Sequence, residues 1–74
     1  MIGARIRRYR EQANFTQEQL GAVLGKDSSV ISKIESGDRR VLAEELKKIA
    51  DALGVTVTEL LDDNSDEEPT QKVG

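Results

Sequence analysis

The 74-residue chain contains neither histidine nor cysteine, so the commonest general base, the commonest metal ligand and the thiolate nucleophile are all missing. No disulfide or thiolate metal site is possible. Carboxylates occur as adjacent pairs at Glu44-Glu45 and Asp62-Asp63. Because neighbours on a helix point about 100° apart, neither pair converges on one atom. The spacing of acids also does not match a calcium-binding loop. We therefore expect no catalytic residue, no metal site and no cofactor.

The polar residues between Gln17 and Glu35 point to recognition rather than catalysis. Short polar side chains and one lysine are expected on the outer side of a helix over residues 28–36, and they are Ser28, Ser29, Ser32 and Lys33. A serine hydroxyl donates or accepts a hydrogen bond, and lysine donates to guanine O6 or N7 or to a phosphate. This stretch is therefore a candidate for contact with a nucleic-acid groove.

One helix is predicted before this stretch, and a second is predicted at its start. Residues 1–13 place one apolar face at helical spacing, formed by Ile2, Ile6, Tyr9 and Ala13. Arg5 and Arg7 are expected on the solvated side, and Asn14 tolerates the left-handed geometry that ends a helix. Thr16 and Gln19 form a capping box that opens a second helix, which runs to residue 24. Its buried side is expected to be Leu20, Val23 and Leu24.

The second helix contains one glycine and ends at another. Gly21 in its interior costs about 1 kcal/mol against alanine, which suggests that another helix crosses close by. Gly25 ends the helix, and Asp27 is expected to cap the third helix. Val30, Ile31 and Ile34 face inward in this third helix, and Gly37 terminates it.

A fourth and a fifth helix complete the predicted fold. The fourth is marked by apolar residues at helical spacing, namely Leu42, Leu46, Ile49, Ala50 and Leu53, and is followed by Gly54. Thr56 and Glu59 form a second capping box that opens a short helix reaching about residue 62. No strand pattern or repeat occurs. The fold class is all-α, with five helices in one domain over residues 1–62, and residues 63–74 are expected to be a disordered acidic tail.

The net charge of −3 is unevenly distributed along the chain. Residues 1–61 carry ten bases and nine acids, for a net charge of +1, whereas residues 62–74 carry five acids and one lysine, for −4. The acidic balance therefore does not exclude a phosphate-binding surface on the folded part. No apolar run reaches the roughly 20 residues that span a bilayer, and no secretory signal is visible, so we expect a cytoplasmic protein without a membrane partner.

A helix-turn-helix needs a small residue where its elements cross, a turn glycine, an apolar inner side and an outer side that fits a groove about 12 Å wide. Gly21, Gly25 and the inner and outer sides of residues 28–36 meet these requirements together. The stretch FTQEQLGAVLGKDSSVISKIESGDRR, with IRRYREQ before it and LKKIADALGVTVTELL after it, resembles the XRE family of phage Cro and lambda-type repressors. The resemblance covers residues 2–61 and implies their five-helix, lambda-repressor-like fold with its helix-turn-helix in the second and third helices.

The resemblance also implies roles for individual residues. Ser28, Ser29, Ser32 and Lys33 match the outward positions of the recognition helix. Phosphate contacts are implied or suggested at Gln17, Lys26, Arg39 and Arg40. Arg10 and Glu35 match a structural ion pair, with a phosphate contact by Arg10 as the alternative. Two positions depart from the family pattern: Lys26 stands where a small apolar residue is usual, and Val41 stands where proline is usual, so the start of the fourth helix is expected to be less rigid.

The expected function is sequence-specific binding of double-stranded DNA by a transcriptional regulator, acting as a repressor. One nine-residue recognition helix is about 13 Å long and reads few base pairs, so a homodimer on a palindromic operator is expected, with half-sites about 34 Å apart. Val57 and Leu61 are the dimerisation candidates, while Leu60 is expected in the core. The alternative is a protein-binding module of the same fold, such as an antitoxin or antagonist that acts through the acidic tail. The sequence does not identify a small-molecule inducer.

Overall fold

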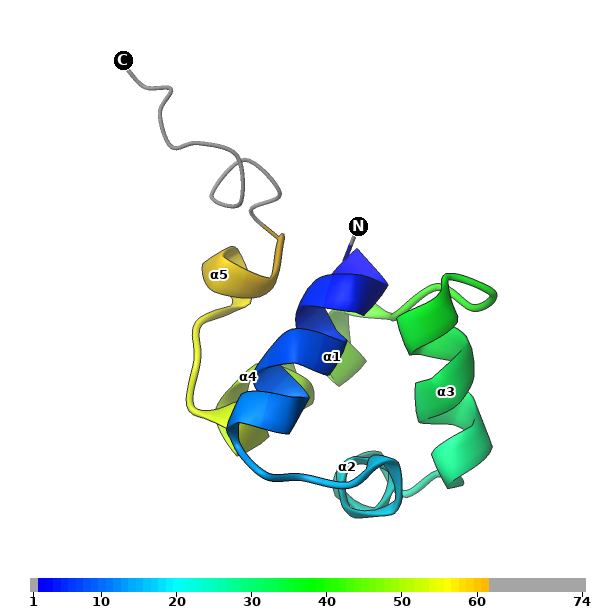
Figure 1. The fold of residues 1–74 in the computed structure, drawn as a ribbon. Coiled ribbons are helices and arrows are strands. Elements are labelled where there is room, and N and C mark those ends of the chain that lie inside the picture. Colours follow the sequence, from blue (N-terminus) through cyan, green and yellow to red (C-terminus); the bar gives the residue numbers. More distant parts are fainter. Residues whose placement is uncertain (1, 62–74) are drawn as a thin grey trace.

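The computed structural model describes residues 2–61, which form five α-helices and no strand (Figure 1). The helices are α1 (Ile2–Gln12), α2 (Gln17–Leu24), α3 (Ser28–Ser36), α4 (Ala43–Leu53) and α5 (Val57–Leu61). Each predicted helix is present, and its ends agree with the prediction to within a residue or two. The predicted acidic tail, residues 63–74, lies outside the described residues.

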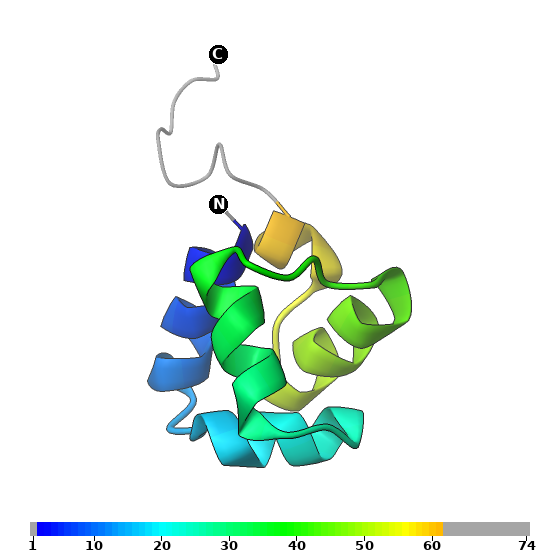
Figure 2. The ribbon, with the colours of Figure 1, turned by 90° about the vertical axis from the view of Figure 1, so that its right-hand side faces the viewer.

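Helix α1 packs against α3, α4 and α5, while α2 packs against α3 and α4 (Figures 1 and 2). The short turn between α2 and α3 makes these two helices close neighbours. In Figure 2, α3 lies across the front of the molecule, with α2 beneath its first turn. The inner side of α3 therefore rests on α1 and α2, and its other side is not covered by any other part of residues 2–61.

The core is formed by apolar side chains from all five helices, namely Ile6, Leu20, Ile31, Ile34, Leu46, Ile49, Ala50, Leu53 and Leu60. Leu60 is fully buried, as predicted, and anchors the short α5 together with the partly buried Val57. Phe15 and Tyr9 are partly buried and pack on this core. Burial of these groups supplies the main favourable free energy of folding, as in any small domain.

Most helix ends use the predicted local chemistry. The Thr16 hydroxyl accepts a hydrogen bond from the Gln19 amide at 3.0 Å, and the Gln19 side chain accepts one from the Thr16 amide at 2.9 Å. Thr56 and Glu59 make the equivalent pair of bonds at the start of α5. Asn14 has φ 62°, the left-handed conformation predicted for the end of α1. Asp27 holds the predicted N-cap position of α3, but its side chain makes no capping hydrogen bond.

Three predicted exposures were wrong. Arg5 is only 2% exposed, because it lies three residues after Ile2 and four before Tyr9, on the buried side of α1. Val23 is 39% exposed, since Leu20 and Leu24 already occupy the side of the short α2 that meets the core. Leu42 is 55% exposed because it precedes the first residue of α4 and lies outside the helical stripe.

Two glycines mark places where backbones nearly touch. A Cβ on Gly3 would collide with the carbonyl oxygen of Ile34 and lie 2.8 Å from that of Glu35, so α1 and α3 meet there without a side chain between them. This contact was not predicted. A Cβ on Gly21 would lie 2.7 Å from the Lys26 carbonyl oxygen. The predicted close approach at Gly21 is therefore present, but its partner is the turn before α3 rather than another helix.

Candidate nucleic-acid interface

The turn between α2 and α3 is set by Gly25, whose φ of 68° is the left-handed conformation that glycine adopts without strain. The amide of Lys26 then donates to the Gly21 carbonyl at 2.9 Å, which closes the end of α2. At the other side of the turn, the amide of Val30 donates to the Asp27 carbonyl at 3.0 Å and begins α3. These bonds fix how α3 leaves α2.

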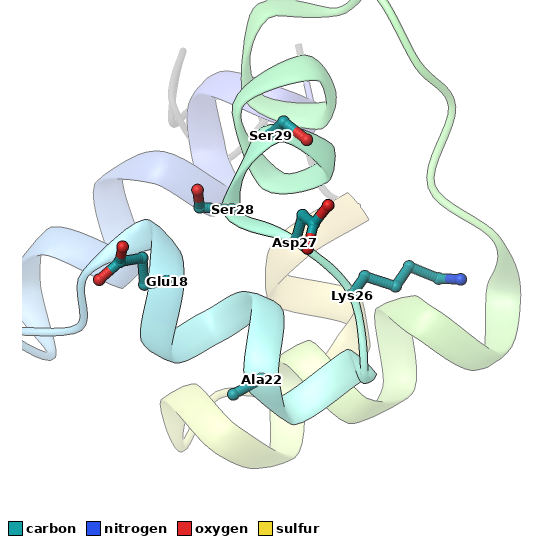
Figure 3. A pocket seen from close by; sticks show the side chains of 6 residues that line it. All are labelled: Glu18, Ala22, Lys26, Asp27, Ser28 and Ser29. Carbon is teal, nitrogen blue, oxygen red and sulfur yellow. The ribbon is translucent and has the colours of Figure 1, made fainter.

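The outer side of α3 carries the predicted recognition residues. Ser29, Ser32 and Lys33 are exposed and Ser28 is half-buried, whereas Ile31 and Ile34 on the inner side are buried. A shallow hollow of about 430 Å³ lies where α3 begins. Its lining residues, labelled in Figure 3, are Glu18, Ala22, Lys26, Asp27, Ser28 and Ser29. The hollow and the serines together form a polar face without bulky side chains.

Two carboxylates border this face, and neither was predicted as part of the site. Figure 3 shows Glu18 on α2 and Asp27 on the turn, on the same side as the two serines. Both residues are exposed. Carboxylates repel phosphate but accept hydrogen bonds from the exocyclic amines of bases, so they favour contact with base edges over contact with the DNA backbone.

Glu35 joins three helices through one carboxylate. The Arg10 guanidinium of α1 donates to it twice, from Nε to Oε2 at 2.6 Å and from Nη2 to Oε1 at 3.2 Å. The Gln17 side chain of α2 donates from Nε2 to Oε1 at 3.0 Å. Glu35 itself lies in the last turns of α3. We refer to Glu35, Arg10 and Gln17 as the Glu35 network.

The Glu35 network is largely shielded from water. Arg10 is 9% exposed and Glu35 is 7% exposed. The hydrogen bond with Glu35 raises the pKa of the Arg10 guanidinium above its ordinary range, so Arg10 keeps its positive charge. Arg10 Nη1 also donates to the Phe15 carbonyl at 2.7 Å and so holds the loop before α2. Three of the five N–H groups of Arg10 are therefore used inside the protein, which supports the structural role predicted for this residue.

Gln17 was predicted to contact phosphate, and the structure assigns one of its donors elsewhere. Its side-chain nitrogen is bonded to Glu35, which leaves the second N–H of the amide and the carbonyl oxygen. As the first residue of α2, Gln17 also has a backbone N–H without an intrahelical acceptor. An anion could therefore meet Gln17 through this backbone amide at the positive end of the helix dipole.

The two arginines after α3 differ in their surroundings. Arg40 is exposed, as a phosphate contact requires. Arg39 instead forms a two-pronged pair with Glu45 of α4, with Nη1–Oε1 and Nη2–Oε2 both at 2.9 Å. This hydrogen bond lowers the pKa of Glu45 to about 2. The phosphate contact predicted for Arg39 stays a prediction, and Glu45 already occupies the Nη1–Nη2 edge of the Arg39 guanidinium.

The remaining predicted positions are accessible to different extents. Lys26 is exposed on the turn, beside the hollow. Of the dimerisation candidates, Leu61 is 54% exposed, whereas Val57 is half-buried and packs on the core. Residues 2–61 contain no cluster of three or more acidic residues that could hold a metal ion. None of the described helices has the length and apolar character needed to cross a bilayer.

Helices α2 and α3 are joined by a glycine turn. The inner side of α3 is bonded to α1 and α2, and its outer side is polar. This arrangement defines a helix-turn-helix protein. Residues 6–60 match the family model described as Helix-turn-helix. The chain belongs to this helix-turn-helix family of DNA-binding transcriptional regulators. The family resemblance and the five-helix, lambda-repressor-like fold inferred from sequence are thereby confirmed.

Two curated relatives illustrate the range of the family. The uncharacterized HTH-type transcriptional regulator y4aM of Sinorhizobium fredii is 37% identical over 73 residues, which are 99% of this chain and 50% of the relative. The chain thus spans about half the length of y4aM. The control protein C.MunI of a Mycoplasma species is 35% identical over 63 residues, which are 84% of this chain and 85% of the relative.

Two solved structures have the same fold. One is the master regulator for biofilm formation SinR in complex with DNA, with a TM-score of 0.76 and 33% identity; the match covers 84% of this chain and all of the SinR chain. The other is the SinR–SinI complex, with a TM-score of 0.77 and 29% identity over 96% of this chain and 70% of the solved chain.

Proposed function

We propose that this protein is a sequence-specific regulator that inserts α3 into the major groove of double-stranded DNA and represses transcription from a palindromic operator as a homodimer. The observation that carries the proposal is the Glu35 network, which fixes α3 to α1 and α2 while its polar side remains open. A rigid support of this kind is what a recognition helix requires to present side chains at fixed positions. The DNA complex of SinR, a relative of the same fold, supports it.

The proposed base contacts come from the outer side of α3. Ser28, Ser29 and Ser32 have short side chains, so the helix can approach the groove floor closely. A serine hydroxyl discriminates poorly between bases, and Lys33 is placed to donate either to guanine or to phosphate. Part of the specificity therefore comes from DNA shape and from the spacing of two half-sites.

The proposed backbone contacts flank this helix. Lys26 lies before α3 and Arg40 lies after it, and both are exposed. The backbone amide of Gln17 adds a contact at the start of α2. Contacts at both ends of α3 and on α2 would hold the helix in register along the groove, whereas the base edges carry the sequence information.

Phosphate contacts by Arg40 and Lys33 are tested by the salt dependence of binding. We expect Arg40→Ala and Lys33→Ala each to weaken binding to specific and nonspecific DNA alike. Each should also flatten the plot of log affinity against log salt concentration by about one unit, the value for one lost phosphate contact. Fluorescence anisotropy at salt concentrations of about 50 to 300 mM measures both effects. Lys47→Ala, at an exposed base of α4 outside the proposed interface, is the control. Unchanged slopes in both variants would contradict the phosphate assignment.

Dimeric binding to a palindrome is tested by selecting bound sequences from random DNA at a stated salt concentration. We expect an inverted repeat whose half-site centres lie about 10 base pairs apart, because this spacing places both grooves on one side of the duplex. Sedimentation should show two chains per selected site. Leu61→Asp should weaken dimerisation without unfolding the domain, since Leu61 is more than half exposed.

Leu42→Asp is the matched control for Leu61→Asp, because Leu42 is equally exposed but lies at the start of α4. It should leave dimerisation unchanged. A chain that sediments as a monomer at high concentration, and also on the selected DNA, would contradict the dimer.

A further inference from the structure

Arg39 holds the segment between α3 and α4, residues 37–42, through hydrogen bonds to α3, to α4 and within the segment itself. Two of its bonds are the pair with Glu45 of α4, and in a third Arg39 Nη1 donates to the carbonyl oxygen of Arg40 at 3.1 Å. The backbone amide of Arg39 donates to the Lys33 carbonyl of α3 at 3.1 Å. Arg39 thus links the end of α3, the segment and the first turn of α4.

Glu45 fixes the other end of the same segment. Its Oε1 accepts the Leu42 amide at 2.9 Å as well as the Arg39 bond. Glu45 is only 5% exposed, whereas the Arg39 side chain is 30% exposed. Residues 39 and 42 are therefore both bonded to one buried carboxylate, Arg39 through its side chain and Leu42 through its backbone amide. Arg40 lies inside this closed segment with an exposed side chain.

A phosphate contact through the Nη1–Nη2 edge of Arg39, which Glu45 occupies, would require this arrangement to open. The guanidinium would leave Glu45, and a buried carboxylate would lose its cation next to a polyanion. Taking the cation away from a buried carboxylate is unfavourable, even though Arg39 itself is partly exposed, and the approach of phosphate adds repulsion. A planar fork that already matches a carboxylate with two parallel bonds has little to gain from the exchange.

We infer that Arg39 is a positioning residue, which closes residues 39–42 onto Glu45 so that the neighbouring Arg40 side chain is aimed at the DNA backbone. The inference rests on the proposed function of the site. It assigns different work to two adjacent arginines: Arg40 neutralises a phosphate, and Arg39 holds the backbone from which Arg40 projects. Both substitutions lower affinity, but only loss of Arg40 removes a counterion-releasing contact.

The test compares Arg39→Ala, Glu45→Gln and their double variant with Arg40→Ala on the selected operator. We expect Arg39→Ala to weaken binding about tenfold with an unchanged salt slope, whereas Arg40→Ala lowers the slope by about one unit. Glu45→Gln retains an acceptor for the Leu42 amide but loses the charge that holds Arg39, so it should weaken binding to a similar extent. The double variant should bind no more weakly than either single variant, because both remove one interaction.

A second measurement, on the free protein, tests whether Arg39 closes residues 39–42 onto Glu45. Hydrogen exchange of the Leu42 amide should be about tenfold faster in Arg39→Ala and unchanged in Arg40→Ala, since only the former opens the segment. Circular dichroism confirms that each variant is helical before it is compared.

Three results would overturn the inference. They are a salt slope that falls in Arg39→Ala as it does in Arg40→Ala, tighter DNA binding by Glu45→Gln because the released Arg39 reaches phosphate, and unchanged exchange of the Leu42 amide in Arg39→Ala. If the unmodified chain enriches no sequence and binds no DNA, the proposed function fails, and the Leu42 exchange still decides whether Arg39 closes the segment.

Discussion

Glu35→Ala is expected to remove most of the stability of the domain at 25 °C. The substitution removes the acceptor for Arg10 and for the Gln17 side chain and leaves the Arg10 guanidinium, 9% exposed, without its partner carboxylate. Breaking one side of a buried pair typically costs about 3–5 kcal/mol. A domain of this size has a total stability near the low end of about 5–15 kcal/mol. Urea unfolding followed by circular dichroism measures the loss.

Two further variants show how much of this loss of stability is due to the burial of the Arg10–Glu35 pair and how much to its charges. Arg7→Ala breaks an exposed pair with Glu11, in which the side chains are 63% and 55% exposed, and should cost less than about 1 kcal/mol. The double variant Arg10→Met with Glu35→Leu replaces the buried pair by apolar groups and should recover much of the stability. Equal effects of Glu35→Ala and Arg7→Ala would show that the Glu35 network contributes no more than a surface pair.

Gly3→Ala is expected to destabilise the protein by about 3 kcal/mol, at the upper end of the usual range for overpacking. Helix propensity alone predicts the opposite sign, because alanine in a helix is favoured over glycine by about 1 kcal/mol. The new methyl group would collide with the Ile34 carbonyl oxygen, and two backbones cannot relieve the clash by a change of rotamer. Helices α1 and α3 would have to separate at this point.

Thermal and urea unfolding of Gly3→Ala measure the effect. Ala4→Gly at the exposed neighbouring position of α1 is the control, and it should lose about 1 kcal/mol through propensity alone. An increase in the stability of Gly3→Ala would show that α1 and α3 do not meet through their backbones.

The sequence predicts the elements of this fold well because their boundaries are encoded locally. Thr16 with Gln19 and Thr56 with Glu59 start helices through bonds that span three residues. A residue that adopts positive φ, as Asn14 and Gly25 do, ends a helix for reasons that need no knowledge of the tertiary structure. Helical periodicity then identified most of the core.

What the residues alone could not predict depends on distant parts of the chain. Arg10 and Glu35 are 25 residues apart, and their pairing was inferred from the family resemblance rather than from spacing. The backbone contact at Gly3 depends on where α3 crosses α1, so a glycine near the chain start looked like a weak helix former. Arg39 and Arg40 are adjacent residues of the same type, so the sequence does not distinguish them. The position of Glu45 on α4 does, because Glu45 pairs with Arg39.

Because of the Glu35 network, the support of α3 lies on the opposite side from the side chains proposed to read DNA. Glu35 makes side-chain bonds that anchor this helix to α1 and to α2. Ser28, Ser29, Ser32 and Lys33 contribute to the outer side instead. We therefore expect that these four side chains can be exchanged as a set while the domain stays folded. If they read DNA as proposed, the same domain would be redirected to a new operator by substitutions at these four positions.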